Sequence, residues 1–208
     1  MSDVVVIDYG AGNLRSVVRA LAQNGANATV SRDPEVVLGA PAVVLPGVGA
    51  AADTMRNLRE AGMVDVVREY LRRDRPFLGV CMGLQALLTM SLEGGEHPCL
   101  DLLPGVARRL PSGQKVPHMG WNEVWQRREH AVFAGIPDGS HFYFVHSYYA
   151  DLADPAVIIA EAEYGLRFAA MVARGGLVAT QFHPEKSGAV GLRLYANFLA
   201  LARVTTPA

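Results

Sequence analysis

One short segment limits, more than any other, what this chain can fold into. It is Pro76-Phe-Leu-Gly-Val-Cys-Met-Gly-Leu-Gln85, an apolar run that leads into a helical pattern, with a cysteine between two glycines. A Gly-x-Cys-x-Gly junction forces a sharp turn from strand to helix and lifts the central side chain into the open. Gly79 and Gly83 lack a Cβ, so strand and helix can pass close together. Cys81 then lies at a helix N-terminus, where backbone N–H groups and the helix dipole favour a thiolate nucleophile.

A second segment supplies the groups that a thiolate nucleophile needs. Leu177–Phe182 has the pattern of a strand, and His183-Pro184-Glu185 follows it directly. Proline holds the preceding residue in an extended conformation, and residues two apart in an extended chain point the same way. His183 and Glu185 are therefore expected on one face, where the carboxylate orients the imidazole and supports its protonated form. Cys81, His183 and Glu185 form the candidate catalytic triad.

The composition fits one α/β domain, residues 1–208, with a sizeable core. The net charge is −1, which gives no general electrostatic reason to bind nucleic acid or an anionic membrane. No run approaches the about 18 uninterrupted apolar residues of a transmembrane helix, and we expect no signal peptide before Val4. Two cysteines, one of them the expected nucleophile, indicate a reduced cytoplasmic protein.

Strands and helices alternate through the first half of the chain. The pattern predicts strands at Val4–Tyr9, Ala28–Ser31, Pro41–Leu45 and Phe77–Val80, and helices ending near Asn24, over Ala51–Arg73, and from the elbow to about Met90. Such alternation predicts a parallel sheet with helices on both faces. Sites in these sheets lie beyond the carboxyl ends of the strands, where the elbow and the glycine loops after residues 9 and 45 should meet.

The second half has a different character, with short β segments and loops. Strands are expected at Val106–Leu110, Glu123–Gln126, His141–Val145, Val157–Ala162, Arg167–Val172 and Leu177–Phe182, before a closing helix over Ala189–Arg203. Several of them alternate or carry aromatic residues, as antiparallel and mixed strands do. We therefore expect a smaller, mainly antiparallel β section beside the parallel core.

The two motif segments resemble those of the class I (triad) glutamine amidotransferases. Further blocks are similar to those of one branch, the glutaminase subunits of imidazole glycerol phosphate synthases: Ile7–Ser16, Leu45–Ala50, Pro117–Asn122, Phe142–Tyr148 and Phe182–Gly188. The resemblance covers nearly the whole chain. It implies one amidotransferase domain with a flavodoxin-like, mixed and mostly parallel central sheet.

The resemblance also implies an activity. Such a glutaminase hydrolyses glutamine to glutamate and ammonia through a cysteinyl thioester. The ammonia passes to a (β/α)₈-barrel cyclase subunit, which makes imidazole glycerol phosphate and aminoimidazole carboxamide ribotide in histidine biosynthesis. The two subunits form a heterodimer.

The attack by Cys81 turns the amide oxygen into an oxyanion, which backbone N–H groups must meet. The elbow supplies the N–H of Met82, and the loop Gly47-Val48-Gly49 is expected to supply the second donor because its glycines permit unusual dihedrals. The resemblance implies that Gln85, Ser147 and Tyr148 bind the glutamine substrate. It further implies that Asn13, Trp121, Tyr143 and Lys186 face the cyclase partner.

Three other functions are compatible with parts of the sequence. Gly10-Ala-Gly12 and Asp33 match a dinucleotide-binding fingerprint in part, although Arg15 stands in place of the third glycine. A redox sensor could use the elbow cysteine, but it would not need His183-Pro-Glu185. A glutaminase with another acceptor, such as the one that serves pyridoxal phosphate synthesis, differs only in the branch-specific blocks.

The sequence predicts neither a metal site nor an organic cofactor. The six histidines lie at positions 97, 118, 130, 141, 146 and 183. None of them forms an i, i+4 pair backed by cysteine or carboxylate ligands. The chemistry of the candidate triad requires no additional group.

Overall fold

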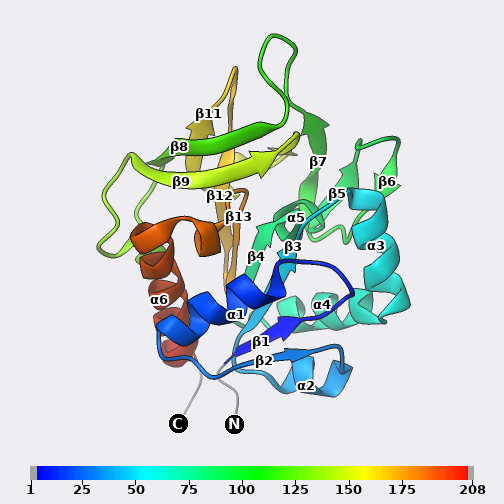
Figure 1. Ribbon diagram of the computed structural model, residues 1–208. Helices are drawn as coiled ribbons and strands as arrows, with labels where there is room; N and C mark the ends of the chain where they lie inside the picture. Colours follow the sequence, from blue (N-terminus) through cyan, green and yellow to red (C-terminus); the bar gives the residue numbers. More distant parts are fainter. Residues whose placement is uncertain (1–3, 206–208) are drawn as a thin grey trace.

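The computed structural model describes residues 4–205, which are built around a nine-stranded mixed sheet (Figure 1). From edge to edge its strands are β2 (Ala28–Ser31), β1 (Val4–Ile7), β3 (Val43–Gly47), β4 (Phe77–Cys81), β13 (Leu177–Thr180), β12 (Arg167–Arg174), β11 (Ile158–Glu163), β8 (His118–Gln126) and β9 (Ser140–His146). The first five are parallel and the rest join antiparallel. The order β2-β1-β3-β4-β13 is that of a flavodoxin-like sheet.

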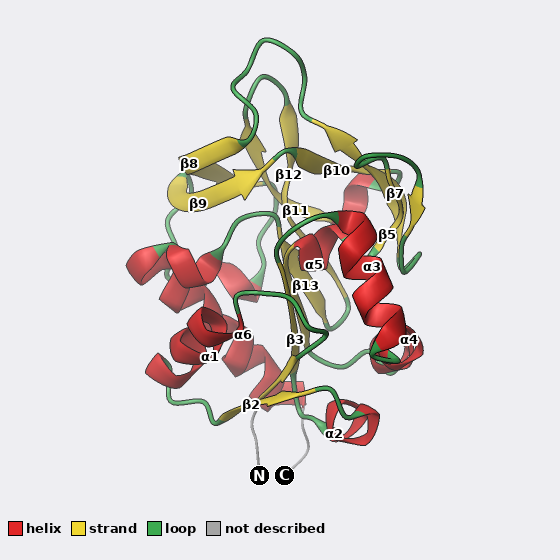
Figure 2. Ribbon diagram, turned by 45° about the vertical axis from the view of Figure 1, so that its right-hand side comes forward, coloured by secondary structure: helices red, strands yellow, loops and turns green. Residues whose placement is uncertain are grey.

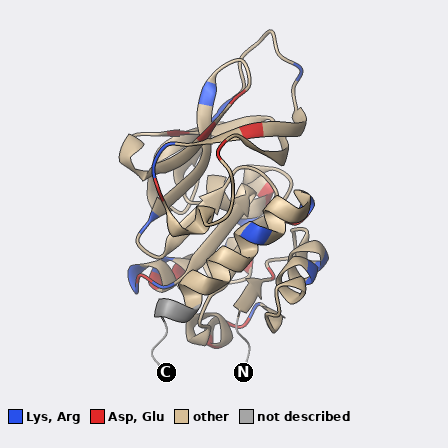
Figure 3. Ribbon diagram, turned by 90° about the vertical axis from the view of Figure 1, so that its left-hand side faces the viewer, with Lys and Arg blue, Asp and Glu red and all other residues tan. Residues whose placement is uncertain are grey.

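Helices cover both faces of the parallel part, as Figure 2 shows. One face carries α1 (Leu14–Gln23) and α6 (Gly188–Thr205), and the other carries α3 (Ala51–Glu60), α4 (Met63–Arg72) and the short α5 (Met82–Gln85). Figure 3 shows acidic and basic residues interspersed on the side of the molecule that α6 covers. Across residues 4–205, no helix has both the length and the apolar character needed to cross a membrane.

The core divides into two buried clusters, one on each side of the sheet. Val4 and Val6 of β1 pack into the cluster that includes Tyr195, whereas Val5 and Ile7 pack into the other. Successive side chains of a strand point to opposite faces, so a strand covered on both faces must be apolar throughout. All four β1 residues are at most 1% exposed.

A second, four-stranded sheet lies beside the carboxyl end of β4. Its order is β10 (Tyr148–Leu152), β7 (Leu103–Arg109), β5 (Leu88–Ser91) and β6 (His97–Pro98). Only the β5–β7 pair is parallel in this sheet. Short 3₁₀ turns occupy η1 (Ala131–Phe133), η2 (Pro155–Val157) and η3 (Pro184–Lys186). The predicted fold class, an α/β protein with a large mixed sheet and a smaller β section, is confirmed.

Two predicted helices were wrong in their bounds, and one helix was not predicted. The helix after Cys81 ends at Gln85 instead of Met90, because Leu88–Ser91 pairs with β6 and β7 as a strand. The predicted helix Ala51–Arg73 breaks at Gly62, whose φ of +67° ends α3 and begins α4. The helix α2 (Pro34–Gly39) was missed, although Asp33 caps it by accepting the Glu35 N–H at 2.9 Å.

Candidate active site

The elbow has the geometry that its sequence predicts. Cys81 ends β4 and caps α5 with φ +54° and ψ −105°, a conformation that costs a non-glycine residue about 1–3 kcal/mol. A Cβ on Gly79 would come within 3.0 Å of the Gly83 carbonyl oxygen, and a Cβ on Gly83 would collide with the carbonyl oxygen of Leu45. The expected close passage of strand and helix is confirmed. It holds the Cys81 side chain at the carboxyl end of the sheet.

His183 and Glu185 form the expected pair behind Cys81. His183 Nδ1 lies 2.7 Å from Glu185 Oε1, and their side chains are 2% and 1% exposed. The pairing arises differently from the prediction. His183 is extended, but Glu185 lies in the 3₁₀ turn η3, which brings its carboxylate back toward the ring. Ser187 Oγ accepts the Tyr143 N–H at 3.0 Å and donates to the His183 carbonyl at 2.6 Å, so β9 holds this turn.

The environment of His183 favours the imidazolium. Burial by itself lowers the pKa of His183, but its interactions with Cys81 and Glu185 outweigh burial and raise the pKa to about 9. Burial raises the pKa of the second cysteine, Cys99, to about 11. Cys81 and Cys99 are both free thiols. Of the two, only Cys81 lies beside a basic group suited to proton transfer.

A titration of His183 tests this environment. Because the pKa of about 9 exceeds the ordinary value of 6.5, protonated His183 stabilises the fold fully below about pH 6.5, and this contribution disappears as the pH rises through about 9. NMR of the His183 ring should show a midpoint near 9. In Glu185→Gln the midpoint should fall by more than about one unit. A wild-type midpoint near 6.5 would contradict the proposed interaction with Cys81 and Glu185.

Cys81 and His183 open onto a cavity of about 370 Å³. The predicted site residues that line it, besides these two, are Val48, Gly49, Met82, Gln85, Ser147, Tyr148 and Lys186; Glu93, Pro117, Val145 and His146 complete it. Gly47 is buried, and its backbone packs against α5, where a Cβ would meet Met82 at 2.6 Å. Glu185 is shielded behind His183. The structure thus brings most of the predicted residues to one cavity.

Gln85 is fixed by hydrogen bonds at the wall of this cavity. Its Nε2 donates to the Tyr148 carbonyl at 2.8 Å and to Gln181 Oε1 at 3.0 Å. Its Oε1 is buried and has no hydrogen-bond partner in the part of the chain that the structure describes. Gln181 in turn donates to Cys81 Sγ at 3.8 Å. Gln85 thus keeps one buried acceptor without a partner at the wall of the cavity.

Three polar residues of this site, Gln181, Glu93 and His146, were not predicted from the sequence. Gln181 had a local signal, since it is a polar residue at the end of an apolar strand and next to His183. Glu93 accepts the N–H of Ala51 at 2.7 Å, which anchors the end of the Val48–Gly49 loop, and His146 is 6% exposed. Nothing in the local sequence pattern distinguishes Glu93 or His146. Their role depends on strands that meet only in the folded chain.

Three of the predicted partner-facing residues form one cluster beside the triad. The rings of Trp121 and Tyr143 meet edge to face at 6.2 Å between centroids, and Lys186 Nζ lies 5.8 Å from the Tyr143 ring centroid. Trp121 is 56% exposed. The fourth, Asn13, contacts the triad instead, with its Nδ2 3.4 Å from Glu185 Oε1. The cluster borders the cavity through Lys186.

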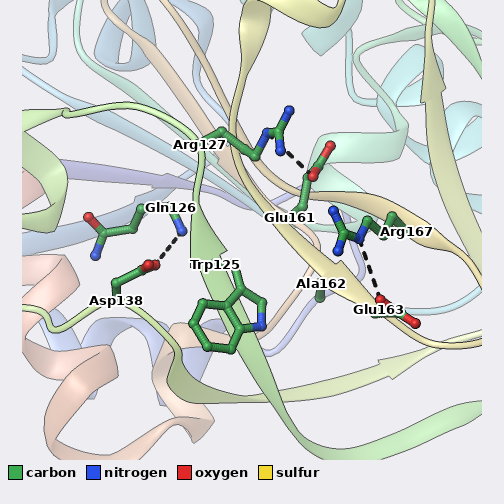
Figure 4. Close-up of a pocket in the computed structure, with 8 residues that line it drawn as sticks. All are labelled: Trp125, Gln126, Arg127, Asp138, Glu161, Ala162, Glu163 and Arg167. Atoms are coloured by element: carbon green, nitrogen blue, oxygen red, sulfur yellow. Dashed lines mark hydrogen bonds and ion pairs between the residues drawn. The ribbon is translucent and has the colours of Figure 1, made fainter.

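A second cavity, of about 330 Å³, lies along β8 and β11 (Figure 4). Its ion pairs are Arg127–Glu161 and Arg167–Glu163, each at 3.4 Å, and Trp125 forms one wall. The lining residues among the described chain include neither cysteine nor histidine. Four of its charged side chains form these ion pairs, and Asp138 accepts the N–H of Gln126 at 2.6 Å, so the cavity offers neither a thiol nor an imidazole for triad chemistry.

A strained elbow cysteine with a buried His–Glu pair, at the carboxyl edge of a doubly wound sheet, defines a triad enzyme of the cysteine-nucleophile class. The family model "Glutamine amidotransferase class-I" matches residues 5–201, and the chain belongs to this family. Among the described residues, no group of three or more His, Cys, Asp or Glu side chains is arranged to hold a metal ion.

Curated relatives agree with this assignment, and solved structures agree with the fold. Proteins named imidazole glycerol phosphate synthase subunit HisH are 50% identical over 96% of this chain and 97% of the relative (Dehalococcoides mccartyi) and 51% identical over 98% of both (Chloroflexus aurantiacus). A crystal structure of a glutamine amidotransferase has a TM-score of 0.75 at 24% identity, covering 96% of this chain and 98% of its own. PurLQS from Thermotoga maritima has a TM-score of 0.73 at 16% identity, covering 96% and 99%. At these identities the solved structures support the fold alone.

Proposed function

We propose that this chain is the glutaminase subunit of an imidazole glycerol phosphate synthase. It hydrolyses L-glutamine to L-glutamate and ammonia, and it passes the ammonia to a (β/α)₈-barrel cyclase subunit in histidine biosynthesis. The observation that carries the proposal is the about 370 Å³ cavity in which the elbow cysteine and the His183–Glu185 pair converge, in a chain about half identical to HisH subunits.

The triad residues have distinct roles in this reaction. Cys81 Sγ attacks the side-chain amide carbon and forms a tetrahedral intermediate. His183, held as imidazolium beside Glu185, donates a proton to the departing ammonia, which leaves a glutamyl thioester on Cys81. Neutral His183 then takes a proton from the water that opens the thioester. Glu185 orients the ring and stabilises its charge throughout.

Other residues of the cavity bind the oxyanion and the polar groups of the substrate. The N–H of Met82 and a peptide of the Gly47–Gly49 loop serve as the oxyanion donors, each worth about 3 kcal/mol of transition-state stabilisation. Gln85, through its unpaired Oε1, accepts a hydrogen bond from the substrate. Ser147 and Tyr148 contact the α-amino and carboxylate groups of glutamine.

Glu93 provides a carboxylate for the α-ammonium group of glutamine. Glu93→Gln keeps an oxygen that can accept the Ala51 N–H but removes the charge. Losing a charged hydrogen bond costs about 1.5–3 kcal/mol, so the KM for glutamine should rise roughly 10- to 100-fold, and kcat should change much less. Steady-state kinetics of Glu93→Gln and of the wild-type protein checks this. An unchanged KM would show that Glu93 does not bind the substrate.

The surface beside the cavity binds the cyclase subunit. Trp121, Tyr143 and Lys186, with Asn13 nearby, face the cyclase, since exposed tryptophan is enriched at interfaces. Ammonia travels directly between the two subunits, because free ammonia in water would be protonated. We further propose that the chain is a single amidotransferase domain, residues 1–208, that works in the cytoplasm without a metal or organic cofactor.

Glutamate release measured with the chain alone, and then with a (β/α)₈ cyclase subunit and its nucleotide substrate, tests the proposed function. Strong stimulation by the loaded cyclase would support both the reaction and the partner. Glutaminase activity that does not change when the loaded cyclase is added would support the proposed reaction and contradict the proposed partner. Absence of glutamate in both mixtures would contradict the proposal as a whole.

A further inference from the structure

Two histidines that the proposed chemistry does not use are buried beside the cavity and contact each other. His118 Nδ1 lies 3.0 Å from His146 Nε2, and the two residues are 4% and 6% exposed. The His118 ring lies between the rings of Tyr164 and Phe144, at centroid distances of 4.0 Å and 5.0 Å. This packing fixes the orientation of the His118 ring.

The hydrogen-bond partners determine where each proton lies. His146 Nδ1 lies 2.9 Å from the Tyr148 carbonyl oxygen, which can only accept, so Nδ1 carries the hydrogen. His146 Nε2 is then the acceptor in a neutral ring and receives the Nδ1–H of His118. His118 Nε2 is left as an acceptor, and Asn122 Nδ2 lies 3.4 Å from it.

Both rings remain neutral at ordinary pH. Burial lowers the pKa of His118 to about 4, and burial, opposed only in part by the bond to Tyr148, lowers the pKa of His146 to about 3. A neutral pair keeps its directional pattern of one donor and one acceptor per ring. The relay, defined here as Asn122, His118, His146 and the Tyr148 carbonyl, therefore does not titrate near neutral pH.

The relay ends at the Tyr148 carbonyl, and Tyr148 lines the same cavity as Cys81. The Tyr148 carbonyl receives hydrogen bonds from both His146 and Gln85, and Gln85 continues through Gln181 to Cys81 Sγ. We infer that His118 and His146 are positioning residues, which hold the Tyr148 carbonyl and with it Gln85 in place for the substrate. This inference rests on the proposed glutaminase function and assigns two further residues to it.

The relay predicts an uncommon tautomer that can be measured without any substitution. In wild-type protein labelled with ¹⁵N-histidine, His146 should be protonated at Nδ1 and bare at Nε2 at neutral pH. Protonation at Nε2 instead would overturn the relay. This readout does not depend on catalysis, so a protein with the expected tautomer but without glutaminase activity would contradict the proposed function and not the relay.

Matched variants of His118 separate positioning from folding. His118→Phe keeps a ring between Tyr164 and Phe144 but removes the donor, whereas His118→Asn carries an amide nitrogen near the place of Nδ1. In His118→Phe the KM for glutamine should rise roughly tenfold, with kcat within about threefold, and His118→Asn should restore much of the loss. Alkylation of Cys81 by iodoacetamide should be unchanged in both variants. A wild-type KM in His118→Phe, or equal losses in the two variants, would contradict the inference.

Discussion

Glutamine hydrolysis is expected to stop when Cys81 is replaced by alanine. Removing the nucleophile of a triad typically lowers kcat on the order of 10⁶-fold, because the remaining groups cannot form the covalent intermediate. The fold and the binding of the cyclase should survive, since Cys81 contributes one small side chain at the end of β4. Glutamate release and co-elution with the cyclase measure the two effects separately. Residual turnover near the wild-type rate would refute Cys81 as the nucleophile.

A glycine variant at the same position provides the control for strain. Cys81→Gly is equally unable to form a thioester, but glycine adopts φ +54° without the penalty that a Cβ brings. Cys81→Gly should therefore be more stable than Cys81→Ala by roughly 1 kcal/mol in urea denaturation. At most other positions the order of these two residues would be the reverse. A less stable glycine variant would show that the elbow is not strained.

The largest effect on stability is expected for Gly83→Ala. The added Cβ would collide with the Leu45 carbonyl oxygen, which belongs to the central strand β3 and cannot move independently of the sheet. Overpacking of this kind costs about 3 kcal/mol, and any relief would displace the elbow and lower the reactivity of Cys81. Urea denaturation gives the free energy of unfolding.

Gly39→Ala is the matched control for Gly83→Ala. Gly39 ends α2, and a Cβ there meets no atom within 4 Å. Because alanine restricts the unfolded chain more than glycine does, Gly39→Ala should be neutral or stabilising by up to about 1 kcal/mol. If the two variants were equally stable, strand and helix would not be in close contact at the elbow.

Features that depend on local chemistry could be predicted from the sequence. The elbow follows from glycines at positions 79 and 83, and the parallel sheet follows from alternating strands and helices. The His183–Glu185 contact was predicted correctly, although a 3₁₀ turn and not an extended chain produces it. Glycine permits the close passage of strand and helix at the elbow, and proline restricts the backbone around His183, so the local sequence marks both points.

Features that depend on distant strands could not be predicted in this way. Leu88–Ser91 follows a helical apolar pattern, and only its pairing with β6 and β7 makes it a strand. His118 and His146 lie 28 residues apart and meet because β8 and β9 pair in one register. Glu93 joins the cavity from the loop after β5. The residues that line the cavity are thus brought together only by the tertiary structure, whereas the nucleophile can be predicted from its local sequence.

All the proposed roles in the cavity depend on one step, the cleavage of glutamine through a thioester on Cys81. Rapid acid quenching of a mixture of the chain, its loaded cyclase partner and glutamine, followed by mass spectrometry of the peptides, tests it most directly. We predict one glutamyl group on the peptide that contains Cys81, and no such group in Cys81→Ala. Glutamate formation at a comparable rate with no adduct on Cys81, or with the adduct on another residue, would contradict this step.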